Sequence, residues 1–284
     1  MSAHFGPGGN SREFAAAGYK STLFAPAWVK QYGLDAYEYE ASRGVNASLD
    51  TFKAIGEAAK QNGVKLSLHA PYFISLSGIE EAKRMGSIRY ITESVAAAHA
   101  LGAGIIVIHC GSASKISRQQ AVNLAKDTLT HAIAEVEKMG IDDVFLGIET
   151  MGKVNQLGTL EEVIDICTID PRLRPVVDFG HLNARECGLF STVEDFKRVF
   201  CLIGEQLGDA CANELHCHFS KIEYTSGGEK KHLTFEDTVF GPSPELFVEA
   251  VKQLKVSPTV ICESDGVMDR DALYMKRLYL EEGV

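Results

Sequence analysis

The segment Ile105-Ile106-Val107-Ile108-His109 is a short apolar run that ends in a potential metal ligand. The same order recurs in Leu66-Ser67-Leu68-His69 and in Val260-Ile261-Cys262-Glu263. Runs of about four to eight apolar residues bounded by loop signals are typical of buried strands. Each of these segments is therefore predicted to be a strand that delivers an imidazole or a carboxylate to the loop after it.

Potential ligands occupy this kind of position repeatedly along the chain. They are His69, His109, Glu149, Asp178, His181, His216, His232 and Glu263. A single histidine or acid after a strand is ordinary, since such a residue often caps the next helix or packs locally. The repetition indicates one polar centre with parallel strands arranged around it.

Strand-like and helix-like segments alternate through the sequence. Apolar runs fall near 36–40, 65–70, 104–109, 144–149, 175–179, 213–219 and 258–263, with a first strand expected around His4 and Phe5. Helical periodicity marks 48–62, 87–101, 121–139, 159–168, 192–207, 244–255 and 269–281. Eight strand–helix units predict an α/β fold, a (β/α)8 TIM barrel, as a single domain over residues 1–284. In such barrels the chemistry lies at the carboxyl ends of the strands.

Composition limits the class of protein. The 284 residues are 45% hydrophobic, and the formal net charge of −10 argues against nucleic-acid binding through bulk charge. No apolar run approaches the roughly 20 residues of a membrane span, and Met1–Asn10 lacks the pattern of a signal peptide. Seven cysteines without a Cys-x-x-Cys pair fit a reducing compartment. We therefore expect a cytoplasmic protein with no membrane partner.

The types of ligand indicate which metal is expected. Histidine, aspartate and glutamate together suit zinc, or manganese, better than calcium or magnesium. Glu149 at a strand end could bridge two ions, and Asp178 and His181 could reach different ions of one cluster. His216 and His218 are two residues apart, so both can face the barrel mouth. We prefer His216 as the ligand and give His218 a supporting or substrate-binding role.

These motifs resemble the endonuclease IV family of apurinic/apyrimidinic endonucleases, within the wider superfamily of xylose-isomerase-like barrels. The resemblance covers most of the chain and depends on the order and spacing of several segments. They are His69-Ala70-Pro71-Tyr72 with Ile74-Ser75-Leu76, His109-Cys110-Gly111-Ser112, Glu149-Thr150 with Gln156-Leu157-Gly158, Asp178-Phe179-Gly180-His181, His216, His232 and Glu263.

The resemblance implies two to three zinc ions, with manganese as the other candidate, and no organic cofactor. One ion would be held by His69 and His109, a second by Asp178, His216 and Glu263, and a third by His181 and His232. Glu149 would bridge the first two ions, and we expect catalysis to depend on Glu149 and Glu263. The implied reaction hydrolyses the phosphodiester 5′ to abasic sites in DNA, the expected partner. Residues expected to contact this substrate are Tyr72, Arg43, Lys230 and His218.

The sequence departs from the family pattern at three places. Lys230 stands where the family has an aspartate two residues before its last histidine, and a protonated lysine cannot ligate zinc. Glu229 is one residue out of register with that aspartate. The loop Ala41–Val45, which in the family penetrates the DNA stack, is short, and the segment Phe5–Gly9 lacks a histidine usual in the family.

Two other functions are compatible with the sequence. A sugar isomerase or epimerase of the same superfamily would use one divalent ion, held here by Glu149, Asp178, His216 and Glu263. His69, His109 and His232 discriminate against that function, because a one-metal enzyme does not need them together as ligands. A non-catalytic metal-binding or ligand-sensing barrel is the third alternative.

Overall fold

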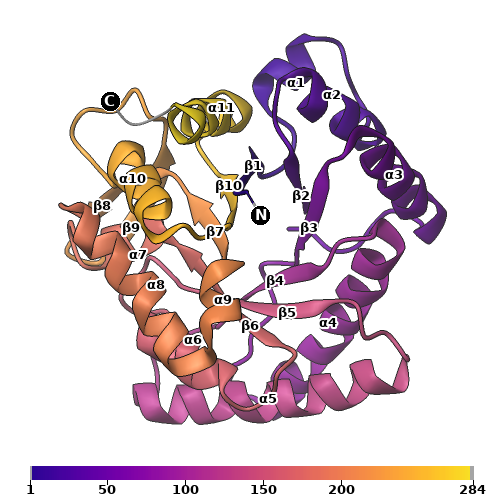
Figure 1. The fold of residues 1–284 in the computed structure, drawn as a ribbon. Coiled ribbons are helices and arrows are strands. Elements are labelled where there is room, and N and C mark those ends of the chain that lie inside the picture. Colours follow the sequence, from indigo (N-terminus) through magenta and orange to yellow (C-terminus); the bar gives the residue numbers. More distant parts are fainter. Residues whose placement is uncertain (1, 282–284) are drawn as a thin grey trace.

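The computed structural model describes residues 2–281, and the eight parallel strands found among them form one sheet. The strands are β1 (His4–Pro7), β2 (Ala36–Glu40), β3 (Lys65–His69), β4 (Ile105–His109), β5 (Phe145–Glu149), β6 (Leu173–Asp178), β7 (His216–Phe219) and β10 (Thr259–Cys262). Their spatial order is β1-β10-β7-β6-β5-β4-β3-β2. The strands gather at the centre and the helices surround them (Figure 1).

The two ends of the sheet meet between β1 and β2. Gly8 forms an isolated parallel bridge with Glu38, and the amide of Gly9 donates to the Glu38 carbonyl at 3.0 Å. The sheet is thus a nearly closed barrel, and the predicted (β/α)8 fold is confirmed.

The seven helices that periodicity predicts are present among the described residues, together with four shorter ones that it does not predict. They are α1 (Arg12–Ala16), α2 (Ala25–Gln31), α3 (Leu49–Asn62), α4 (Glu81–Leu101), α5 (Arg118–Lys138), α6 (Leu160–Cys167), α7 (Phe179–Arg185), α8 (Val193–Leu207), α9 (Asp209–Asn213), α10 (Pro244–Leu254) and α11 (Met268–Leu280), with a 3-10 turn, η1 (Thr22–Phe24). Gly63 and Gly102 end α3 and α4 in the left-handed conformation, with φ of 65° and 72°. The longest described helices carry no stretch apolar enough to cross a bilayer.

The segment after β7 differs most from the prediction. The sequence pattern marks neither a strand nor a helix there, but the chain forms an antiparallel hairpin of β8 (Lys221–Thr225) and β9 (Gly228–Leu233). The hairpin packs against α7, a short helix that periodicity also missed. Glycine turns join polar, short strands in this region, and such strands carry a weak sequence signal.

Phe179 fixes the start of α7. Its ring is fully buried, with its centroid 4.8 Å from that of Phe247 on α10 and 5.7 Å from that of Phe196 on α8. β6 ends at the preceding residue, Asp178, whose side chain caps α7 by accepting from the His181 amide at 2.8 Å. This apolar anchor therefore determines where the Asp178 carboxylate lies.

Gly6 allows β1 and β2 to approach closely at the seam of the barrel. A Cβ atom at this position would lie 1.7 Å from the carbonyl oxygen of Ala36. We expect Gly6→Ala to lower the free energy of unfolding by about 3 kcal/mol, because the two strands would have to separate. Urea denaturation measures the loss.

Gly86→Ala is the matched control. This glycine lies inside α4, where a Cβ would meet nothing within 4 Å, so its replacement should raise stability by about 0.5–1 kcal/mol. If Gly6→Ala unfolds at the same urea concentration as the wild type, the seam is not closely packed.

Candidate metal centre

All the predicted ligands except His216 converge at the carboxyl-terminal mouth of the barrel. A cavity of about 270 Å³ opens there. Its walls include His69, His109, Glu149, His181, His232 and Glu263. The strand ends that carry these side chains lie far apart in the sequence, and closure of the barrel brings them together.

Glu149, at the end of β5, is the centre of the arrangement. Its side chain is 1% exposed. Oε2 lies 3.1 Å from His109 Nε2 and 3.5 Å from His69 Nε2. Oε1 lies 3.0 Å from His218 Nδ1. One carboxylate therefore faces two separate sets of nitrogen donors, as a bridging ligand would.

His69, His109 and Glu149 form the first possible ligand group. The Nδ1 atom of His69 lies 2.9 Å from the carbonyl oxygen of Ala70. A proton on Nδ1 donated to that oxygen leaves the lone pair of Nε2 directed at Glu149 and the cavity. The two imidazole rings are perpendicular, at an interplanar angle of 85°, so their Nε2 atoms approach Glu149 from different directions.

Glu149, Asp178, His218 and Glu263 form the second group. His218 Nδ1 is 3.4 Å from Glu263 Oε1, in addition to its hydrogen bond with Glu149. Asp178 is fully buried, and its Oδ2 atom has no hydrogen-bond partner among the described residues. Three carboxylates and one imidazole thus surround a common point.

The structure exchanges the roles expected for His216 and His218: His218 belongs to the second ligand group, and His216 does not. His218 pairs with Asp178 in the register of β6 and β7, whereas His216 pairs with Val176, one inward-facing position deeper in the barrel. His216 instead lines a second cavity, of about 220 Å³, with Lys65 and Thr259 at the opposite end of the strands. The spacing of two correctly indicated a shared face, but only the register shows which histidine reaches the mouth.

His181, Glu229 and His232 form the third group. Glu229 lies 3.6 Å from His181 Nε2 and 3.9 Å from His232 Nε2 through its two carboxylate oxygens. The Nδ1 atoms of both histidines are held from behind, at 3.0 Å from the Thr150 carbonyl oxygen and 2.9 Å from Ser220 Oγ. Both rings therefore direct Nε2 at Glu229.

A β-bulge explains why Glu229 takes the place expected for residue 230. Glu223 pairs with Lys231, and the next residue on β8, Tyr224, pairs with Glu229, so Lys230 is the extra residue. A bulge of this kind interrupts the strict alternation of faces along a strand. Lys230 and Lys231 both pair with the Glu223 carboxylate, and Glu229 is left facing the cavity with His232.

The donor set fits divalent cations. The distances of 3.0–3.9 Å between donor atoms compare with roughly 3.3 Å between two ligands of one tetrahedral zinc. Glu149 Oε2, like Asp178 Oδ2, is buried without a hydrogen-bond donor. Burial and neighbouring carboxylates raise the pKa of Glu263 to about 8, against the opposing effect of the His218 imidazole. Clustered carboxylates of this kind are stabilised by a cation.

Of the four residues expected to contact substrate, one lines the cavity and three do not. Tyr72 lines the cavity and is 63% exposed. Arg43 is exposed in the short loop after β2, outside the cavity wall. Lys230 lies on the outer face of the hairpin in its ion pair with Glu223, and His218 is fully buried among the ligands. Lys153, a further cation of the loops at this face, lines the cavity together with Tyr72.

Glu38 is the buried residue that the sequence interpretation missed. It lies on β2, is fully buried, and contacts both histidines of β7. The signal was present in Tyr37-Glu38-Tyr39-Glu40, because alternation along a strand places every second residue on the inner face of a barrel. Glu38 lies two residues before the end of β2, and the pattern of an apolar run followed by a ligand marks strand ends only.

A model of the family described as xylose isomerase-like TIM barrel matches residues 26–277. An uncharacterized protein of Methanocaldococcus jannaschii is 30% identical over 253 residues, which cover 89% of this chain and 90% of that protein. A probable endonuclease 4 of Acholeplasma laidlawii is 27% identical over 209 residues, covering 67% of this chain and 69% of the relative.

Two solved structures share the fold. Endonuclease IV from Thermus thermophilus and a D-tagatose 3-epimerase-like protein each superpose with a TM-score of 0.68 at 18% identity. Each superposition covers 97% of this chain, with 97% of the endonuclease and 95% of the epimerase-like protein. The family match and the barrel together show that this chain belongs to the xylose isomerase-like TIM barrel family, with relatives that are named probable endonuclease 4.

Proposed function

We propose that this protein is a zinc-dependent phosphodiesterase of DNA repair that hydrolyses the phosphodiester 5′ to abasic sites in the cytoplasm. The observation that carries the proposal is the presence of three ligand groups at one cavity, two of which share Glu149. Relatives named probable endonuclease 4 support the same substrate class.

Bound zinc would lower the pKa of a coordinated water toward neutrality and offset negative charge on the phosphate. The protein itself contributes by orienting the nitrogen and oxygen atoms that would bind the metal. Nδ1 contacts orient His69, His181 and His232 before any ion arrives. Glu149 and Glu263 supply the carboxylates on which the reaction is proposed to depend, and Lys153 adds a positive charge to the cavity wall.

Arg185 supports the loop that carries Lys153. Its guanidinium donates to the carbonyl oxygens of Met151 and Lys153 at 3.0 and 2.8 Å, and to those of Val154 and Gln156 at 3.1 Å. The four bonds come from Nη1 and Nη2, which carry four of the five N–H donors of the guanidinium, so Arg185 is a support for the loop rather than a phosphate ligand. The loop after β5 therefore presents Lys153 from a fixed backbone.

The alternative is a sugar isomerase or epimerase that uses one divalent ion. The second ligand group, with His218 in place of His216, would hold that ion. The similarity to the D-tagatose 3-epimerase-like structure favours this function equally at the level of the fold. The first and third groups favour the phosphodiesterase, because a one-metal enzyme leaves His109 and His232 without a role.

Metal content and substrate together distinguish the two functions. Purified protein reconstituted with zinc should carry two to three ions per chain and should nick a duplex with one abasic site on its 5′ side. Mass spectrometry of the metal and a gel assay of the duplex measure these outcomes, with an intact duplex of the same sequence as control. One bound ion, an unbroken duplex and epimerisation of D-tagatose would establish the alternative.

Glu149→Gln tests the bridging role. The amide keeps the size of the side chain but removes the charge that faces both donor sets. We expect nicking to fall about 1000-fold, equivalent to roughly 4 kcal/mol of transition-state stabilisation, with the fold retained. Single-turnover kinetics and circular dichroism measure the two effects. A folded Glu149→Gln variant with wild-type rates would contradict the bridge.

Glu229→Gln and Lys230→Asp form a matched pair on adjacent residues. Glu229 faces His181 and His232, so its replacement should reduce the metal content by about one ion per chain. Lys230 lies on the other face of the hairpin, so Lys230→Asp should leave the content unchanged. Metal analysis after gel filtration measures the number of ions per chain in each variant. A gain of metal in Lys230→Asp would mean that residue 230 faces the cavity and that the bulge is misplaced.

A further inference from the structure

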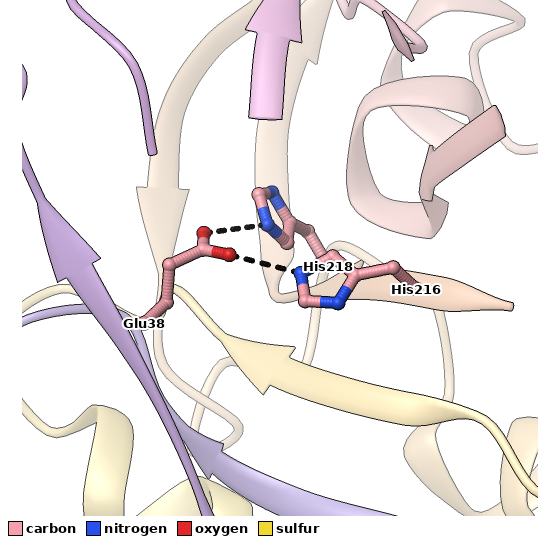
Figure 2. A group of neighbouring side chains, drawn as sticks. All are labelled: Glu38, His216 and His218. Atoms are coloured by element: carbon pink, nitrogen blue, oxygen red, sulfur yellow. Dashed lines mark hydrogen bonds and ion pairs between the residues drawn. The ribbon is translucent and has the colours of Figure 1, made fainter. Parts of the chain in front are cut away.

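A fully buried carboxylate, Glu38, lies directly beneath the second ligand group. Its Oε2 atom accepts from Ser67 Oγ at 2.7 Å and from His216 Nε2 at 2.9 Å. Its Oε1 atom lies 2.8 Å from His218 Nε2. Figure 2 shows the two imidazoles of β7 turned toward the two oxygens of this one carboxylate.

No lysine or arginine neutralises Glu38 within residues 2–281; its ion pairs there are with the two histidines. Oε1 and His218 Nε2 have no hydrogen bond to any other described group, although both are fully buried. An uncompensated carboxylate in this position would be costly, so a proton on His218 Nε2 is the stabilising element. Glu38 thereby selects the tautomer of His218.

We infer that Glu38 is a positioning residue of the metal centre, which holds His218 Nε2 so that Nδ1 presents its lone pair to the metal. Metal-binding histidines generally donate their other ring N–H to a carboxylate or carbonyl, and this contact fixes both tautomer and ring orientation. His69, His181 and His232 have Nδ1 contacts to protein oxygens and direct Nε2 into the cavity. In His218 the two nitrogens exchange these roles: Nε2 contacts a protein oxygen and Nδ1 faces the ligand group. The cause is Glu38, which approaches Nε2 from a different strand.

Ser67 and His216 have a supporting role in this arrangement. Both donate to Oε2, from β3 and β7, which leaves Oε1 directed at His218. Hydrogen bonds from two strands thus fix the position of the Glu38 carboxylate relative to His218. This gives His216 a function without metal contact, beneath the mouth of the barrel.

The inference rests on the metal centre of the proposed function but not on the DNA substrate, because His218 belongs to the ligand group of either candidate enzyme. Its test measures zinc affinity of the whole protein by competition with a chromophoric chelator. The absorption spectrum of the cobalt-substituted protein is a second readout, which reports the geometry of the ligands.

Glu38→Gln should weaken the binding of one ion by about 10- to 100-fold and change the cobalt spectrum. Ser67→Ala, which keeps the carboxylate, should change the affinity less than Glu38→Gln does. Asp269→Asn is the matched control, because Asp269 is another fully buried carboxylate, bound by Ser11 Oγ at 2.6 Å and Trp28 Nε1 at 3.0 Å outside the ligand groups. This control should leave zinc affinity unchanged.

Wild-type zinc affinity and an unchanged cobalt spectrum in Glu38→Gln would overturn the inference. If Glu38→Gln does not fold, Glu38→Asp replaces it: this variant keeps the charge but withdraws the carboxylate from His218 Nε2, and wild-type affinity there has the same meaning. A fourth ion in the wild type that Glu38→Gln removes would also overturn it, because Glu38 would then be a ligand itself. A wild type that binds no zinc would overturn the proposed function along with this inference.

Discussion

The burial of the Glu149 carboxylate between two sets of imidazoles is the constraint on which the site depends. His109 Nε2 approaches one of its oxygens to 3.1 Å and His218 Nδ1 approaches the other to 3.0 Å. Parallel strands make this possible, because all their carboxyl ends lie at the same mouth of the barrel. The close seam at Gly6 and the capping of α7 by Asp178 maintain the same geometry from the surrounding fold.

The barrel and most strand ends could be predicted from sequence because each strand carries its own local pattern, an apolar run followed by a potential ligand. His216 and His218 could not be ordered in this way, since their depth depends on the register of β7 against β6. Glu229 depends on a bulge in a polar hairpin, which leaves no periodic signal. Glu38 lies inside a strand rather than at its end, so the pattern of an apolar run followed by a ligand does not mark it.

The same barrel supports nucleases and sugar enzymes, so the fold does not decide the function. The buried residues Glu149, Asp178 and His218 and the partly exposed Glu263 are common to both chemistries, whereas the histidines contributed by β3, β4 and β9 extend the site across the mouth. Glu38 adds a layer beneath both, in which one acid and two imidazoles connect β2 with β7. The candidate metal centre therefore has two layers: the possible ligands at the mouth and, below them, the residues that orient them.

Anomalous X-ray scattering at the zinc absorption edge, from crystals of the zinc-loaded protein, tests the central claim most directly. The account predicts separate zinc peaks on the two sides of Glu149, one beside His69 and His109 and one beside His218 and Glu263. A further peak beside His181 and His232 is expected at the third group. A single peak confined to the second group, with none beside His109, would contradict a polynuclear centre bridged by Glu149.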